Sequence, residues 1–222
     1  MSRPCEFRDL GRMGYEAAYA LQRELVSRRK AGEIPDQLLF VEHPPVITMG
    51  RNAREANILF SREALFASGV EVHETDRGGN VTYHGPGQIV GYPIFDLREW
   101  KRDVGAYLRA VEQVIIEAIG EFGYEGERVP GATGVWVGPA KVAAIGVHLS
   151  RWVSSHGFAL NVETNLDHFK FIVPCGLNKP VTSLRALGCS ASVEGVKESL
   201  LAAFSEVFEI EIPQPATMSR LA

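Results

Sequence analysis

The chain has 222 residues, of which 45% are hydrophobic and 23% are charged, so it can form a core and has no disordered character. Its formal net charge of -4 argues against general nucleic-acid binding, which requires a basic surface. The three cysteines, Cys5, Cys175 and Cys189, are widely spaced, so we expect no disulfide framework and no metal site. No apolar run approaches membrane-spanning length, so we expect no membrane segment. Together these features lead us to expect a cytoplasmic location.

Helical and extended segments are both expected in the first part of the chain. Residues 15–30 place apolar side chains at helical spacing and end in three cations, which suit the negative end of a helix dipole. Residues 38–42 and 46–49 are short apolar runs typical of strands. Ser61 is a good N-cap for a short helix that Gly69 ends.

The longest helix signal is followed by strand signals. Residues 103–122 carry one broad apolar stripe behind Asp103, a favourable N-cap. Residues 134–137, 141–149 and 153–162 then show a period of two, interrupted by short turns. These three segments therefore predict an antiparallel meander.

The last part of the chain contains one more helix and a tail. A helix is expected from about Ser192, and residues 212–222, rich in proline and small side chains, are expected to form a loose end. No linker interrupts the chain, so residues 1–222 are predicted to form one domain. Because helices and antiparallel strands occur in separate runs, the expected class is α+β.

The most unusual segment is RGGNVTYHGPGQ at residues 77–88. Four glycines and a proline within a dozen residues are incompatible with a helix interior or an ordinary central strand. Glycine allows a backbone to approach a ligand closely, but a surface hairpin with tight turns accounts for the composition equally well. The glycine spacing does not match the dinucleotide-binding fingerprint, and no phosphate-binding loop motif is present.

Two residues are candidates for covalent chemistry. Cys175 lies between a proline and a glycine, outside any periodic segment, which suits a nucleophile presented on a loop. A thiol attacks as the thiolate and needs a basic partner, whereas a buried, inert cysteine is the commoner alternative. Lys141 is the candidate partner, although lysine at the start of a strand is usually solvated. Strict alternation puts Lys141 on one strand face and the small residues Ala144 and Gly146 on the other.

Motifs along nearly the whole chain resemble the octanoyltransferase family of lipoate biosynthesis, the lipoyl(octanoyl) transferases. They are HPPVITMGR at 43–51, RGGNVTYHGPGQ at 77–88, KVAAIGV at 141–147, HGFALNV at 156–162 and PCG at 174–176. The resemblance implies the fold shared with biotin and lipoate protein ligases, which is a mixed, mainly antiparallel β-sheet flanked by helices.

The resemblance also implies a reaction. An octanoyl group would pass from octanoyl-acyl carrier protein to Cys175 as a thioester. It would then pass to the lysine of an apo lipoyl domain, in 2-oxoacid dehydrogenase complexes or in the glycine cleavage H protein. Lys141 would lower the pKa of the thiol and carry protons. Thioester to amide runs downhill, so no cofactor is expected, and we expect a monomer.

Substrate contacts are implied for three segments. They are Arg77, Gly78, Gly79, Asn80, Val81, Thr82, Tyr83 and His84; Ala144, Ile145 and Gly146; and Gly157, Phe158 and Ala159. His148 departs from the family, in which many relatives carry Arg or Lys, and contact with the carrier there would make affinity pH-sensitive.

Three alternatives stay open at this point. An ATP-dependent lipoate or biotin ligase has the same fold but needs no nucleophilic cysteine. An amidotransferase would move lipoyl or octanoyl groups between proteins, also through a thioester. A binding protein for lipoyl domains, without catalysis, is the alternative from another class.

Overall fold

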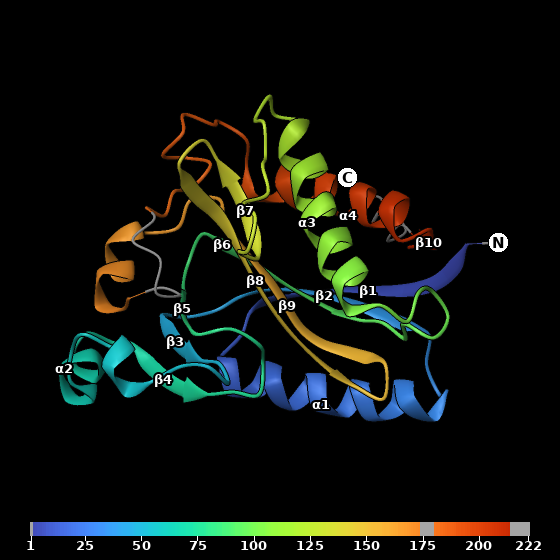
Figure 1. Cartoon of the computed structure of the whole chain (residues 1–222), viewed down its shortest axis with the longest axis horizontal. Helices are drawn as coiled ribbons and strands as arrows, with labels where there is room; N and C mark the ends of the chain where they lie inside the picture. The colour runs from blue at the N-terminus through green and yellow to red at the C-terminus, as the bar shows by residue number, and fades with distance from the viewer. Residues whose placement is uncertain (1, 174–179, 214–222) are drawn as a thin grey trace, which may run out of the picture.

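The computed structural model describes residues 2–173 and 180–213, drawn in colour in Figure 1. Within these ranges the centre is a seven-stranded sheet in the order β10-β1-β2-β6-β9-β8-β7. Its strands are β1 (Arg3–Arg12), β2 (Asp36–Glu42), β6 (Gln88–Ile94), β7 (Gly134–Val137), β8 (Ala140–Ser150), β9 (Val153–Asn161) and β10 (Ile210–Glu211). β1 runs parallel to β2 and β10, and the other neighbours are antiparallel. The predicted fold class, a mixed and mainly antiparallel sheet in an α+β domain, is confirmed.

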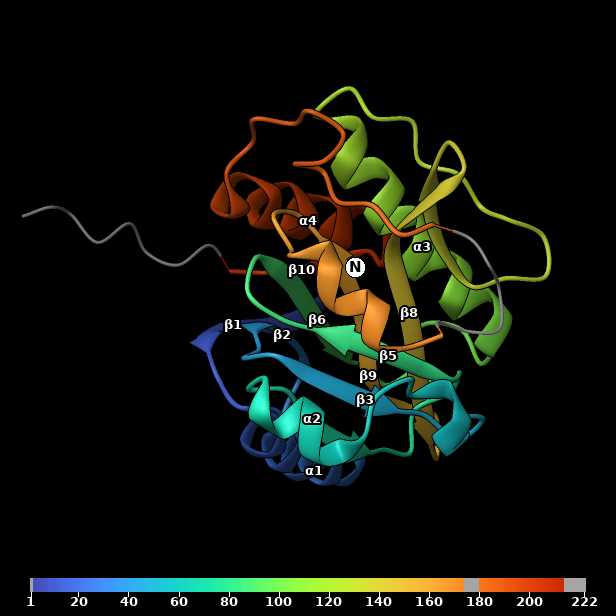
Figure 2. The ribbon, with the colours of Figure 1, turned by 90° about the vertical axis from the view of Figure 1, so that its left-hand side faces the viewer.

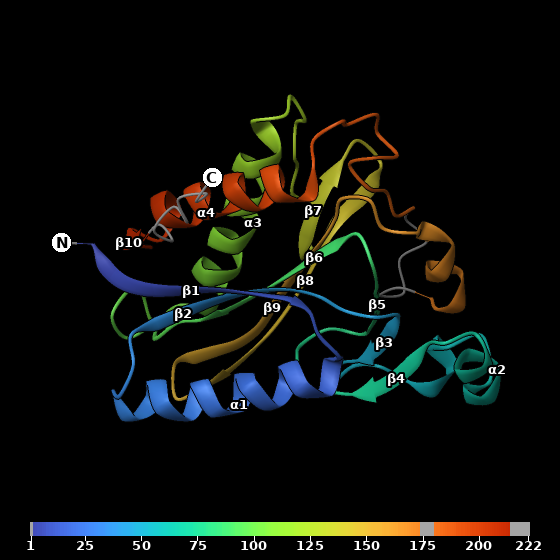
Figure 3. The same ribbon diagram turned by 180° about the vertical axis from the view of Figure 1, so that it is seen from behind.

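Helices cover both faces of this sheet (Figures 1 and 3). The helix α1 (Tyr15–Ala31) lies on one face, and α3 (Val104–Gly120) and α4 (Val193–Val207) lie on the other. Alternate side chains of β2 divide accordingly. Leu39 and Val41 pack in the α1 core, whereas Leu38 and Phe40 pack in the α3 and α4 core. Because both faces are covered, the central strands are apolar on both sides.

A smaller sheet lies beside the large one. It has the order β4-β3-β5 and consists of β3 (Val46–Met49), β4 (Glu71–Glu74) and β5 (Val81–His84). The helix α2 (Arg62–Ala67) and the 3-10 helices η1 (Glu55–Asn57) and η2 (Leu166–Phe171) accompany it. Figure 2 shows β3 and β5 crossing in front of β8 and β9, and a hydrogen bond from Gly78 N–H to Val147 O joins the glycine-rich segment to β8.

The predicted helix starts are confirmed by their caps. The side chains of Ser61, Asp103 and Ser192 each accept a hydrogen bond from the backbone N–H three residues later. The strand β1 is not predicted from the sequence. Only Cys5 is buried among its ten residues, and its charged side chains hide any alternation of apolar and polar positions. The predicted tail at 212–222 lies outside the described residues from 214 onward.

Candidate active site

A pocket lies between the two sheets. It is lined by residues of β6, β8 and β9 on one side and of the glycine-rich segment on the other. Most of the predicted site residues line it, namely Arg77, Gly79, Asn80, Val81, Thr82, His84, Lys141, Ala144, Ile145, Gly146, Gly157, Phe158 and Ala159. Segments more than 60 residues apart in the chain are thus brought to one cavity, as the resemblance implies. Their roles toward a substrate remain predictions.

Two predicted residues within the described ranges, Gly78 and Tyr83, do not line this pocket. The backbone N–H of Gly78 donates to Val147 O at 2.8 Å, so Gly78 joins the loop to β8. Tyr83 is buried in the core of the small sheet, and its hydroxyl bonds His168 Nδ1 at 2.7 Å. Cys175 lies outside the described residues.

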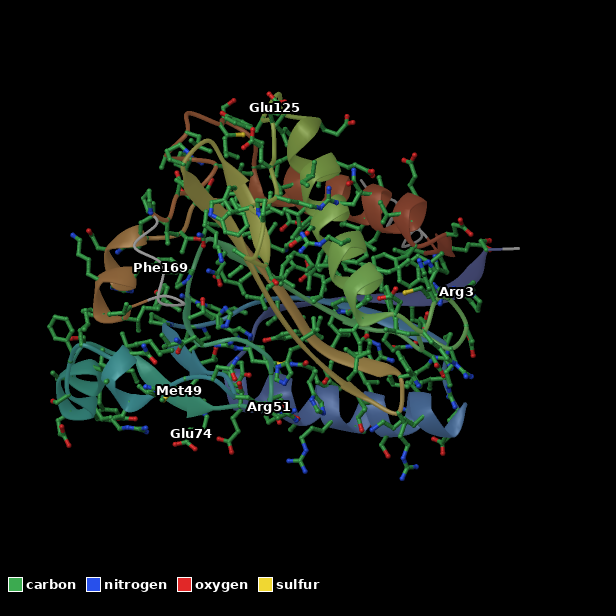
Figure 4. The ribbon with its side chains drawn as sticks, in the orientation of Figure 1. Arg3, Met49, Arg51, Glu74, Glu125 and Phe169 are labelled. Carbon is green, nitrogen blue, oxygen red and sulfur yellow. The ribbon has the colours of Figure 1, made fainter. Side chains whose placement is uncertain are left out.

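Several lining residues were missed by sequence reasoning. They are Tyr15, Gln88, Val90, Tyr92, Thr133, His156, Asn161, Phe169 and Val181. Gln88, His156 and Asn161 stand inside the quoted motifs, so the signal was present. Phe169 lies on η2 (labelled in Figure 4), in a segment with no motif that could have indicated it.

Lys141 reaches the pocket from the start of β8. Its Nζ donates to Thr133 O at 3.2 Å. The same Nζ lies 4.5 Å from the centre of the Trp136 ring, which is fully buried, so a cation–π interaction holds the ammonium. Lys141 is therefore half-buried and ordered, not solvated as a lysine at a strand start usually is.

The strand face predicted for Lys141 is wrong because β8 contains a β-bulge. In the pairing of β7 with β8, Val135 faces Ala143 but the next residue, Trp136, faces Lys141, so β8 carries one extra residue. The extra residue breaks the period of two. Lys141 and Ala144 consequently both line the pocket, whereas strict alternation had separated them.

The glycines of β8 and β9 leave room mainly for neighbouring backbone. A Cβ on Gly146 would lie 2.8 Å from Gly78 O. A Cβ on Gly157 would lie 2.1 Å from the carbonyl oxygen of Gly91. The small side chains that seemed suited to an acyl chain therefore serve first to let the glycine-rich loop and β6 approach these strands.

Arg77 braces the glycine-rich loop against β3. Its Nη2 donates to Thr48 O at 2.6 Å and to Thr48 Oγ1 at 3.0 Å, and its Nε donates to the same hydroxyl at 3.2 Å. A further bond runs from Nη1 to Gly78 O at 3.1 Å. The Arg77 side chain is thus an ordered, buried cation at the pocket wall.

His84 belongs to a chain of buried polar side chains at the wall of the pocket. Its Nε2 lies 3.3 Å from Thr48 Oγ1, and its Nδ1 lies 2.8 Å from Gln88 Oε1. Gln88 Nε2 donates to Asn161 Oδ1 at 2.8 Å, and Asn161 Nδ2 donates to Thr182 O at 3.0 Å. Burial, with a smaller effect of the neighbouring imidazole of His43, lowers the pKa of His84 to about 3. A neutral, fully bonded His84 is poorly suited to act as a general base.

Asp76 organises a second polar cluster at the outer side of β9. Its Oδ1 accepts from His156 Nε2 at 2.7 Å and from the Tyr19 hydroxyl at 2.9 Å. Burial alone would raise the pKa of Asp76, but these hydrogen bonds outweigh it and bring the pKa below the usual range. His148 lies 3.6 Å from the other carboxylate oxygen and bonds Arg51 (labelled in Figure 4), outside the pocket. His156 thus joins β9 to Asp76, the residue that precedes the glycine-rich segment.

The described residues were also searched for metal-binding clusters and membrane-spanning helices. Among the residues of 2–173 and 180–213 no group of three or more His, Cys, Asp or Glu side chains could hold a metal ion. Over the same ranges no helix has the length and apolarity needed to cross a bilayer.

The chain is similar in sequence to one family of known proteins. Residues 14–205 match the family model described as lipoyl protein ligase A/B catalytic domain. The octanoyltransferase of Solibacter usitatus is 55% identical, and the alignment covers 98% of this chain and 99% of the relative. The octanoyltransferase of Gloeobacter violaceus is 46% identical, with 98% and 96% covered.

Solved structures are similar in fold at low identity. A lipoate-protein ligase A bound with ATP superposes with a TM-score of 0.78 and 15% identity, covering 97% of this chain and 89% of the ligase. The biotin protein ligase of Aquifex aeolicus in complex with biotin and ATP gives a TM-score of 0.57 at 13% identity, with 92% and 70% covered. Identities this low support a shared fold and nothing finer.

Proposed function

This chain belongs to the lipoyl protein ligase A/B catalytic domain family, and we propose that it transfers an octanoyl group from octanoyl-acyl carrier protein to the lysine of apo lipoyl domains. The observation that carries the proposal is the 55% identity to an octanoyltransferase over nearly the full length of both chains. The acceptors are lipoyl domains of 2-oxoacid dehydrogenase complexes and the glycine cleavage H protein. The enzyme acts as a monomer in the cytoplasm, where a nucleophilic thiol stays reduced.

We propose Cys175 as the nucleophile and Lys141 as its partner. The support comes from the described residues on either side of the cysteine. Val173 donates its N–H to Asn57 O at 2.8 Å, and Lys141 donates its N–H to Pro180 O at 2.9 Å. Cys175 is five residues from Pro180, and five residues span at most about 18 Å when extended. This chain length allows the proposed thiol to reach Lys141, which supports the pairing.

In the proposed reaction, Cys175 carries the acyl group and Lys141 carries the protons, so no further reactant is needed. The Cys175 thiolate attacks the carbonyl carbon of the donor thioester, a new carbon–sulfur bond forms, and the carrier thiolate leaves with a proton from the Lys141 ammonium. The lysine amine of the lipoyl domain then attacks the Cys175 thioester. The carbon–sulfur bond breaks, an amide forms, and neutral Lys141 takes the amine proton. Thiolate and ammonium are thereby restored.

The pocket suits an unbranched acyl chain. The pocket has an apolar lining that includes Val90, Phe158, Ala159, Phe169 and Val181. Each methylene group moved out of water contributes about 0.8 kcal/mol, which is about a fourfold gain in specificity per carbon that fits. The walls thus favour medium-chain acyl groups over acetyl.

Transfer without ATP tests the proposal. The chain is incubated with octanoyl-acyl carrier protein and an apo lipoyl domain, and the acceptor is weighed by mass spectrometry. We expect octanoylation with no nucleotide, and no product from free octanoate with ATP. Product that requires ATP would instead identify a ligase. Transfer from an octanoylated lipoyl domain that outcompetes the carrier would identify an amidotransferase.

A further inference from the structure

The chain of buried polar side chains at the pocket wall has a fixed direction of hydrogen bonding. At one end stands Thr182 O, a carbonyl oxygen that can only accept, and at the other stands the Arg77 guanidinium, which can only donate. Between them lie the side chains of Asn161, Gln88, His84 and Thr48, each able to be oriented in two ways.

Each orientation follows from its neighbour. Because Thr182 O accepts, Asn161 presents its NH₂ there and its Oδ1 to Gln88. Gln88 must then donate from Nε2 and accept at Oε1, so His84 Nδ1 carries the proton. With Nδ1 protonated and the ring neutral, Nε2 accepts the Thr48 hydroxyl.

The Arg77 end leads to the same orientation. Thr48 Oγ1 accepts two bonds from the Arg77 guanidinium and is left with its own proton to donate. His84 Nε2 is the ring atom within reach of that proton, so it must be the acceptor. Both ends of the chain therefore demand one tautomer, with the proton on Nδ1.

We infer that Gln88 and Asn161 are positioning residues for acyl transfer, a role that rests on the proposed function. Their side chains join the glycine-rich loop, through His84, Thr48 and Arg77, to residue 182. Residue 182 is in turn bonded to Lys141, since Thr182 N donates to Lys141 O at 2.9 Å. The chain of bonds sets the two walls of the pocket at one separation, so the acyl carbonyl and Lys141 keep a fixed relation.

Two variants with opposite effects on His84 test the inference. Gln88→Leu removes the acceptor of the Nδ1 proton, and His84 should shift toward the Nε2-protonated form. Gln88→Glu keeps that acceptor but loses the donor to Asn161, so His84 should keep the Nδ1 proton. Both variants should lower kcat at least tenfold while KM for the octanoyl donor changes less than threefold, because the chain of bonds is cut in each.

Nitrogen chemical shifts of the histidine rings in the full, ligand-free chain provide the direct measurement. The His84 signal is assigned by its loss in His84→Asn, and kcat is compared with the control Gln113→Glu. Gln113 lies on α3, where it accepts from Arg128, and its replacement should leave kcat unchanged. Thermal unfolding verifies that each variant is folded.

The outcomes separate this inference from the proposed function. An Nε2-protonated or charged His84 in the parent chain at neutral pH overturns the inference, whatever the activity. Unchanged kcat in Gln88→Glu and in Asn161→Asp, which cannot donate to Thr182 O, overturns the positioning role. A parent chain that transfers no octanoyl group contradicts the proposed function. The tautomer of His84 is measured independently of activity, so an Nε2-protonated ring would still overturn the inference.

Discussion

Lys141 and Val181 form a parallel β-bridge. The N–H of Lys141 donates to Pro180 O and the N–H of Thr182 donates to Lys141 O, both at 2.9 Å. Lys141, the second residue of β8, is therefore fixed to the chain that follows the predicted nucleophile, although the two are far apart in sequence. Any change that displaces residues 180–182 should also displace the Lys141 ammonium.

Replacing Lys141 in two ways should separate its two proposed tasks. Lys141→Ala removes the charge, so the pKa of the Cys175 thiol should rise and acyl loading should fall by orders of magnitude. Lys141→Arg keeps the charge but cannot give up a proton near neutral pH. Its thiol pKa should stay low while turnover still falls at least a hundredfold. Alkylation rates measured against pH report the thiol pKa.

The other two cysteines are buried and should contribute little to the measured alkylation rate. Cys5 is 1% exposed and Cys189 is 8% exposed. Burial raises the pKa of the Cys5 thiol well above its ordinary value. Alkylation near pH 7 should therefore report Cys175, and the double variant Cys5→Ala, Cys189→Ala should give the same rates. An equal thiol pKa in the parent chain and Lys141→Ala would refute the pairing.

Gly146→Ala should damage activity through the loop that it touches. The new methyl group would meet Gly78 O at 2.8 Å, so the glycine-rich loop must move, at a cost of about 1–3 kcal/mol in the free energy of unfolding. We expect at least a tenfold loss of kcat/KM. Gly120→Ala is the matched control, because nothing lies within 4 Å of its added carbon. This control, near the end of α3, should stabilise the fold by about 0.5–1 kcal/mol.

Ala144→Leu should shorten the acyl chain that fits. Ala144 lines the same pocket as Lys141, and the larger side chain would occupy space that we propose for the acyl chain. The ratio of kcat/KM for octanoyl over butyryl donors should fall at least tenfold. Ala202→Leu, on the exposed face of α4, should leave the ratio unchanged. An unchanged ratio in Ala144→Leu would place the acyl chain elsewhere.

Acid should destabilise the fold through its buried histidines. Burial lowers the folded-state pKa values of His84, His43 and His156 below that of an unfolded histidine. The unfolded chain then binds more protons below about pH 6.5, so stability is lost as pH falls from there. Each histidine that stays neutral contributes up to about 1.4 kcal/mol per pH unit.

Urea unfolding at pH 7 and pH 5 measures this effect. The loss of unfolding free energy between the two values should be smaller in His84→Asn than in the parent chain. His73→Asn is the control, since His73 lies on β4 with an acidic neighbour, Glu71, at 2.8 Å and is not buried in the core. An identical loss in the parent chain and His84→Asn would show that His84 is charged in the folded state at pH 5.

The sequence predicted what depends on local pattern. The helix caps Ser61, Asp103 and Ser192 and the meander of β7, β8 and β9 follow from side-chain chemistry and period, and both are present. Residues of the motifs at 77–88, 141–147 and 156–162 line the pocket, and their roles toward a substrate stay predictions. Tertiary contacts decided the rest.

Three features were beyond local pattern. The bulge that turns Lys141 into the pocket depends on how β7 pairs with β8, which no periodicity reveals. The glycines at 146 and 157 are required by the backbone of Gly78 and Gly91, which are distant in sequence. The polar chain through Gln88 and Asn161 joins residues 73 positions apart, so its geometry could not be derived before the fold.

The thioester on Cys175 is the central claim, and intact mass spectrometry with the octanoyl donor alone tests it most directly. The parent chain should gain one octanoyl group, which hydroxylamine removes. The adduct should be absent from Cys175→Ala and present in Cys5→Ala and Cys189→Ala. An adduct that survives in Cys175→Ala, or none in a parent chain that still octanoylates lipoyl domains, would contradict the account.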